Sequence, residues 1–168
     1  MEEYTIERFM DKIVFSDTEK IKKDYPYHAF PIIAIGIEII GRLACDEEFD
    51  KSGVSGELFY KAIQTCPSLG KYKKYNTDKN ANLLYKGLRC SMLHSFIPDG
   101  FKLVPGKNKL DENVIGCEEL YDDVCKAWVF IKKHEITSNN IKEILFNVNG
   151  VSSGSTINNI FINEANKK

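Results

Sequence analysis

Arg89 and His94 stand five positions apart in a segment whose other residues are mostly apolar. Arginine keeps its charge throughout the physiological pH range, and histidine gains or loses a proton near neutrality. Together they can hold the oxygens of a phosphoryl group and move a proton from a ribose hydroxyl or to a leaving oxygen. These are the groups that a metal-independent ribonuclease needs.

The spacing does not bring the two side chains together on one α-helix. At 100° per residue, positions five apart diverge by about 140°. The helix expected over 80–96 carries two apolar stripes, and Arg89 and His94 flank the second one. That stripe consists of Leu83, Gly87, Cys90 and Leu93. If it packs against its own copy across a two-fold axis, two arginines and two histidines surround one cleft. We therefore expect a homodimer with the site at its interface.

A purely structural interpretation of the same residues stays open. Arg89 can pair with a buried acid such as Glu38, and His94 can satisfy a backbone carbonyl near a helix end. Glu38 lies in an isoleucine-rich segment and can either orient Arg89 or His94 or serve only as a salt-bridge partner. Cys90 and Ser91, which follow Arg89 directly, are further candidates for groups around the site.

Other chemical motifs are missing from the sequence. It has no HExxH, no CxxC pair, no GxGxxG and no P-loop. We therefore expect neither a metal nor a cofactor. Lysines and arginines (23) balance aspartates and glutamates (24), so any RNA contact must be local. Lys71, Lys73 and Lys74, interleaved with tyrosines, either contact a phosphate backbone or belong to a solvated loop.

The segment from Leu84 to His94 resembles the signature helix of the HEPN superfamily (higher eukaryotes and prokaryotes nucleotide-binding domains). Its hallmark is an arginine, four to six residues, and then a histidine; here the gap is four. The resemblance covers roughly residues 25–148 and implies an up-and-down helical bundle. Many members are homodimers that cleave RNA without metal in toxin–antitoxin, antiphage or CRISPR-associated systems. It implies that Arg89 stabilises the transition state and that His94 transfers a proton.

Two positions depart from the pattern of this superfamily. Active members usually have a polar residue directly after the arginine, where this chain has Cys90. Members silenced by a partner nucleotidyltransferase carry a tyrosine where this chain has Phe96. The resemblance therefore implies either a ribonuclease or RNA-binding homodimer, or a non-catalytic helical scaffold. A scaffold would bind a partner protein, for example one from the same operon in a defence or toxin–antitoxin system.

The hydrophobic periodicity predicts an all-α fold with a single domain over 1–168. Ser55 is the expected N-cap of a helix of about ten residues that ends before Pro67, and Pro31 is expected in the first turn of its helix. The segment 101–115 is expected to form a small loop or β-hairpin insertion. The other helices are expected over 4–14, 31–46, 80–96, 117–133 and 138–148.

The composition points to the cytoplasm. The five cysteines are odd in number and lack a CxxC pair, which predicts reduced core thiols without a disulfide. The acidic start lacks the pattern of a signal peptide. The most apolar stretch, 30–44, is interrupted by Pro31, Glu38 and Arg42, so we expect no membrane-spanning segment and no membrane partner.

Overall fold

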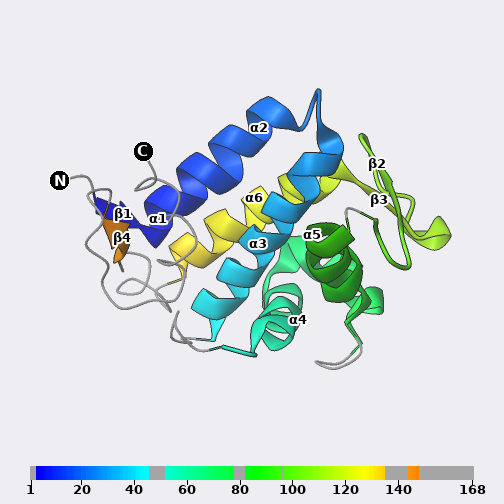
Figure 1. Ribbon diagram of the computed structural model, residues 1–168. Coiled ribbons are helices and arrows are strands. Elements are labelled where there is room, and N and C mark those ends of the chain that lie inside the picture. Colours follow the sequence, from blue (N-terminus) through cyan, green and yellow to red (C-terminus); the bar gives the residue numbers. More distant parts are fainter. Residues whose placement is uncertain (1–2, 46–51, 78–81, 96, 135–143, 148–168) are drawn as a thin grey trace.

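Helix α3 (Pro26–Ala44) runs through the middle of the protein, and the other helices pack around it (Figure 1). The computed structural model describes residues 3–45, 52–77, 82–95, 97–134 and 144–147. Helices α4 (Ser55–Thr65) and α6 (Cys117–Lys133) make the most extensive contacts with α3. At Gly41 the backbones of α3 and α4 approach so closely that a Cβ atom would overlap the carbonyl of Leu58. The protein is mostly helical, as predicted.

Helix α3 begins earlier than the sequence suggested. Pro26 occupies its first turn, where a missing N–H costs nothing. Pro31, predicted for that place, lies inside the helix instead. The expectation of a helix over 31–46 is confirmed for most of this segment. By length and composition α3 is the one described helix apolar enough to cross a membrane, but most of it is buried inside the protein. It therefore fits the core helix of a soluble protein.

The N-terminal helical run lies along one side of α3 (Figure 1). It consists of α1 (Ile6–Phe9), the π-helix η1 (Met10–Asp17) and α2 (Thr18–Ile21). The hydroxyl oxygen of Thr5 caps it by accepting the N–H of Arg8 at 3.2 Å. Ile6, Met10 and Val14 join the central hydrophobic core. The predicted helix over 4–14 therefore exists, but it starts at Ile6 and continues to Ile21.

Two short strands replace helix at the ends of the described chain. Strand β1 (Glu3–Thr5) pairs antiparallel with β4 (Ile144–Asn147). The prediction of a helix over 138–148 was thus wrong for residues 144–147, because this segment pairs with the start of the chain. Its remaining residues lie outside the described part. Phe96 also lies outside it.

The insertion after the arginine–histidine segment also differs from its predicted form. Strands β2 (Lys102–Val104) and β3 (Val114–Gly116) pair in parallel, so the two do not form a simple β-hairpin. The connection folds back through the short helix η4 (Leu110–Glu112) and a left-handed turn at Asn113. This reversal lets β3 run in the same direction as β2. Helix α6 follows directly and has the bounds that its amphipathic pattern predicted.

The basic segment after α4 is ordered and not a polar loop. It forms the 3-10 helix η2 (Pro67–Tyr75), whose Tyr72 and Tyr75 are buried. The prediction of a loop missed the burial of these two rings, because the lysines around them dominate the composition of the segment.

All five cysteines are free thiols. Burial raises the pKa of Cys66 to about 12 and that of Cys117 to about 11.

Candidate functional site

The motif helix, which we define as η3 (Tyr85–Ser91) with α5 (Met92–Ser95), carries Arg89 and His94. Leu84, Leu88 and Met92 fix it to the core, where all three are buried. Asn82 supports its start, because its Oδ1 accepts the N–H of Tyr85 at 2.9 Å. At Gly87 the insertion presses on the helix so closely that a Cβ atom would overlap Asp99 and Phe101. Helix position and rotation are therefore well defined.

The motif helix is π-helical around Arg89, which changes the expected geometry. A π turn bonds residues five apart and advances less per residue than an α turn. The hydroxyl of Ser91 accordingly donates to the carbonyl of Lys86 at 2.9 Å. The divergence of about 140° expected for Arg89 and His94 assumed α-helical geometry throughout. Arg89, Cys90 and Ser91 belong to the π segment. The angle between the Arg89 and His94 directions around the helix axis is therefore smaller than about 140°, the value of an α-helix.

Arg89 is held by a chain of three side chains from three helices. Its Nε–H donates to Oε2 of Glu38 on α3 at 3.0 Å. The other carboxylate oxygen, Oε1, accepts the hydroxyl of Ser55 on α4 at 2.7 Å. Glu38 is 15% exposed and Arg89 29%, so the pair is half-sheltered from solvent. We call Glu38, Ser55 and Arg89 the arginine cluster.

The terminal NH2 groups of Arg89 make no hydrogen bond with the residues that the structure describes. Glu38 engages only the Nε edge, and its second oxygen is occupied by Ser55. A guanidinium with a fixed Nε and free terminal nitrogens can accept an anion on its outer edge. The geometry around Arg89 therefore fits phosphate recognition as well as a salt bridge.

Tyr85 and Cys90 border the arginine cluster. Burial raises the pKa of Tyr85, and the adjacent Cys90 thiol and the charge of Glu38 raise it further, while Arg89 lowers it. The Tyr85 ring also packs on Phe59 of α4, with centroids 5.8 Å apart. Tyr85 therefore stays protonated at neutral pH and can donate a hydrogen bond. The hydroxyl of Ser91, in contrast, donates to the backbone of its own helix.

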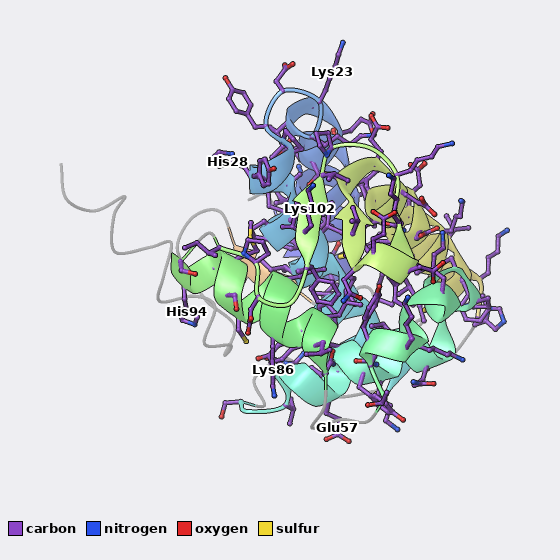
Figure 2. All side chains as sticks on the ribbon, turned by 90° about the vertical axis from the view of Figure 1, so that its right-hand side faces the viewer. Lys23, His28, Glu57, Lys86, His94 and Lys102 are labelled. Atoms are coloured by element: carbon purple, nitrogen blue, oxygen red, sulfur yellow. The ribbon has the colours of Figure 1, made fainter. Side chains whose placement is uncertain are left out.

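His94 stands apart from the arginine cluster. It is exposed near the outer end of the motif helix, where Figure 2 shows its side chain pointing away from the body of the protein. It forms no hydrogen bond or ion pair with Arg89 or with any other described residue. Within one chain, the structure therefore joins Glu38 to Arg89 but leaves His94 separate.

The outer surface of the motif helix is apolar at both ends. Leu83 and Leu93 are exposed, and so is Ile97 just beyond the helix. Cys90 between them is half-buried. Gly87, the fourth member of the predicted stripe, is instead covered by Phe101. An exposed apolar surface of this kind is available for contact with another chain.

The three lysines predicted to contact RNA differ in their surroundings. Lys71 forms ion pairs with Glu119 and Asp123 of α6. Lys74 donates to the carbonyl of Leu110 at 2.6 Å. Lys73 is exposed and pairs with no described residue. Two of the three lysines are thus engaged within the protein.

Sequence reasoning missed two members of the site. Ser55 looked like an N-cap, but it is the first residue of α4 and its hydroxyl bonds Glu38 instead of the helix backbone. Tyr85 was not among the candidate site residues. Nothing in the sequence links Ser55 to Glu38, because the two are distant in the chain and meet only when α3 packs against α4.

The comparisons with known proteins add no relative. No model of a protein family, no curated protein and no solved structure matches this chain. Among the described residues, no group of three or more histidine, cysteine, aspartate or glutamate side chains is arranged to hold a metal ion. The function has to be argued from the arginine cluster, His94 and the surfaces around them.

Proposed function

We propose that this chain is a cytoplasmic HEPN-like protein that acts on RNA as a homodimer, with Arg89 and His94 in a cleft at the dimer interface. Its reaction would be metal-independent cleavage of single-stranded RNA. The observation that carries the proposal is the guanidinium of Arg89, which donates at Nε to Glu38 while its terminal nitrogens bond none of the residues that the structure describes. The free thiols of all five cysteines favour a reducing compartment.

The arginine cluster suits a phosphoryl group better than a salt bridge alone would. An arginine in a purely structural pair usually gains from a two-point contact with the carboxylate. Here Arg89 has a one-point contact with Glu38, whose other oxygen accepts the Ser55 hydroxyl. Because Glu38 fixes the Nε edge, the guanidinium of Arg89 would already be oriented when a phosphate binds. Glu38 and Ser55 are then positioning residues.

A second copy of the chain would supply what one copy lacks. His94 has no partner among the described residues and lies beside the exposed Leu93. Pairing of the exposed leucines across a two-fold axis would bring the His94 side chains of both copies toward the axis. His94 of one copy would then complete the site around Arg89.

In that cleft the chemistry needs only these groups. His94 takes the proton of the ribose 2′-hydroxyl, the 2′-oxygen bonds to phosphorus, and the bond from phosphorus to the 5′-oxygen breaks. The leaving 5′-oxygen receives a proton from the His94 of the other copy, which is protonated at the start of the reaction. Arg89 stabilises the charge that develops on the non-bridging oxygens. The products are a 2′,3′-cyclic phosphate and a 5′-hydroxyl.

A non-catalytic scaffold is the second candidate. The apolar outer surface of the motif helix at Leu83, Leu93 and Ile97 favours it, because such a surface can hold a protein partner from the same operon without any reaction. In that case Arg89 and Glu38 form a structural pair, and Cys90 marks the loss of activity.

Cleavage of a labelled single-stranded RNA in EDTA distinguishes the two candidates. The ribonuclease is expected to cut in EDTA and to leave 2′,3′-cyclic phosphate ends, because a side chain activates the nucleophile. A substrate with 2′-deoxyribose throughout should stay intact. If diverse single-stranded RNAs remain uncut at micromolar protein, the scaffold is the better description.

A further inference from the structure

Two tyrosine rings project into solvent where α2 leads into α3. Tyr25 is 61% exposed and Tyr27 51%, and no other tyrosine, phenylalanine or tryptophan whose exposure the structure describes is as open. They flank Pro26, the first residue of α3. Aromatic rings of this size are mostly covered in folded proteins. Two exposed rings at one corner are therefore available for contact with a ligand.

Both rings are held in place before any ligand arrives. The hydroxyl of Tyr27 donates to the carbonyl of Leu103 on β2 at 3.4 Å. The Tyr25 ring meets the ring of His28 edge-on, with centroids 5.9 Å apart. The backbone N–H of Tyr25 donates to the carbonyl of Ile21 at 2.7 Å. Rings that are already ordered lose little conformational entropy when a ligand stacks on them.

Two lysines are neighbours of the rings: Lys23 precedes Tyr25 by two residues, and Lys102 precedes Leu103, whose carbonyl accepts the Tyr27 hydroxyl. Lys23 and Lys102 are exposed, and neither side chain forms a hydrogen bond or ion pair with a described residue. Figure 2 shows Lys23, His28 and Lys102 on the same side of the protein, above the motif helix. Asp24 is the acidic neighbour in the turn. We define the corner patch as Lys23, Tyr25, Tyr27, His28 and Lys102.

The corner patch is connected to the motif helix through direct contacts. Gly87 of the motif helix lies against Phe101, the residue that precedes Lys102. The next residue, Leu103, accepts the hydroxyl of Tyr27. The buried residues Phe101 and Leu103 therefore link the corner patch to the motif helix inside the protein.

We propose that the corner patch binds single-stranded RNA, with bases stacked on Tyr25 and Tyr27 and phosphates beside Lys23 and Lys102. Exposed rings interleaved with cations are the means by which proteins hold unpaired strands. In protein–protein interfaces, by contrast, lysine is depleted relative to the rest of the surface. The inference takes its ligand from the proposed function, but it concerns binding outside the Arg89–His94 cleft.

Fluorescence anisotropy with a ten-nucleotide 2′-O-methyl RNA tests the patch, because this probe lacks the 2′-hydroxyl and cannot be cut. Tyr25→Leu and Tyr27→Leu keep apolar bulk but remove the ring, and each should weaken binding roughly 5- to 150-fold. Tyr25→Phe should bind almost as the wild type does, and Tyr27→Phe should bind slightly more weakly because it lacks the hydrogen bond to Leu103. Lys102→Gln should lower the slope of log affinity against log salt by about 0.7. Tyr60→Leu, on α4, is the matched control ring and should change nothing.

The outcomes separate this inference from the proposed function. A probe of abasic ribose-phosphate should bind the wild type weakly and should not distinguish Tyr25→Leu from it. If the leucine variants bind RNA as tightly as the wild type, the patch is not the binding surface, although cleavage at Arg89 and His94 can still hold. If no RNA binds, or if only anionic vesicles do, the inference is overturned. Failure of the proposed function appears separately, as uncut natural RNA in EDTA.

Discussion

Two clusters in this protein each place a carboxylate of low exposure beside a cation, yet they differ in what they leave open. In the arginine cluster, Glu38 accepts Ser55 and one edge of Arg89. The second cluster surrounds Asp123 of α6, which is 4% exposed and accepts the hydroxyl of Tyr72 at 2.8 Å. Lys71 pairs with the same carboxylate at 3.0 Å. We call this second group the Asp123 cluster.

The Asp123 cluster uses its polar groups to join three segments. Asn108 of the insertion donates to the Tyr72 hydroxyl at 2.8 Å and accepts the N–H of Gly116 at 2.8 Å. The backbone N–H of Asn108 donates to Glu119 at 2.9 Å, and Lys71 also pairs with Glu119. The pKa of Glu119 is lowered, first by Lys71 and then by the Asn108 N–H. Such a network stabilises one arrangement of η2, α6 and the insertion.

The difference shows that a sheltered ion pair is not by itself a site. In the Asp123 cluster each donor already has an acceptor within the protein, so a ligand would have to displace an existing bond. In the arginine cluster the terminal nitrogens of Arg89 bond no acceptor within the described part of the chain. Spare donors on a fixed side chain, and not the presence of charge, distinguish the candidate site from the structural network.

The largest expected effect is on cleavage. His94→Ala should lower the rate about 10²- to 10⁴-fold, because it removes the proton-transfer group. Arg89→Ala should cost a few kcal/mol of transition-state stabilisation. Tyr72→Phe in the Asp123 cluster is the matched control and should cut as fast as the wild type. Initial rates on one labelled RNA give the comparison, with circular dichroism to check folding. Equal rates for His94→Ala and the wild type would remove His94 from the mechanism.

The next effect is on the free energy of unfolding, where we expect a larger loss from the Asp123 cluster than from the arginine cluster. Asp123→Ala leaves Lys71 and Tyr72 without their shared acceptor, and we expect a loss of about 3 kcal/mol in the free energy of unfolding. Glu38→Gln keeps one acceptor oxygen for Arg89, and its NH2 group can donate to the Ser55 hydroxyl, so it should cost about 1 kcal/mol or less. Urea denaturation measures both. If Glu38→Gln proves the more damaging of the two, the arginine cluster is the structural one.

The sequence predicted well those elements whose stability depends on one face. Helix α6 has apolar residues at helical spacing, acids in its first turn and Lys132 and Lys133 in its last, and its bounds were correct. The helix containing Glu38 was also recognised, although Pro26 and not Pro31 occupies its first turn. In these cases local pattern and tertiary packing agree.

The sequence failed where pairing between distant segments decides the structure. Strand β4 forms because β1 lies beside it, which no local pattern reveals. Tyr72 is buried because Asp123, far along the chain, accepts its hydroxyl. The same applies at the site: Glu38 was named as a partner of Arg89, whereas Ser55 was not. The π-helical turn around Arg89 was not expected either, since the apolar stripes fit an α-helix.

The dimer proposed for the arginine cluster gives a smaller effect. Leu93→Glu places a charge on the exposed apolar surface of the motif helix and should weaken dimerisation at least about tenfold. Val129→Glu puts the same charge on an exposed apolar residue of α6, away from the motif helix, and should leave the dimer intact. Multi-angle light scattering over a concentration series distinguishes them. A wild type that remains monomeric at micromolar concentration contradicts the proposed interface.

The smallest effect compares the two tyrosines that border the clusters at alkaline pH. Burial raises the pKa of Tyr72, and the charge of Asp123 raises it further. The pKa of Tyr85 is raised too, but Arg89 opposes the shift. A tyrosine with a raised pKa contributes stability in full below its ordinary value of about 10, and the contribution is lost above it, because only the unfolded chain releases the proton there. For Tyr72 the loss approaches about 1.4 kcal/mol per pH unit.

Tyr72→Phe should therefore be less stable at pH 8 but should lose less stability than the wild type between pH 10 and 11. Tyr85→Phe should flatten the decline less. Other groups that titrate in this range, such as the Cys66 thiol, are common to all three proteins and cancel in the comparison. Urea midpoints at four pH values supply the slopes, and a Tyr72→Phe slope as steep as that of the wild type would show that Asp123 does not hold this proton.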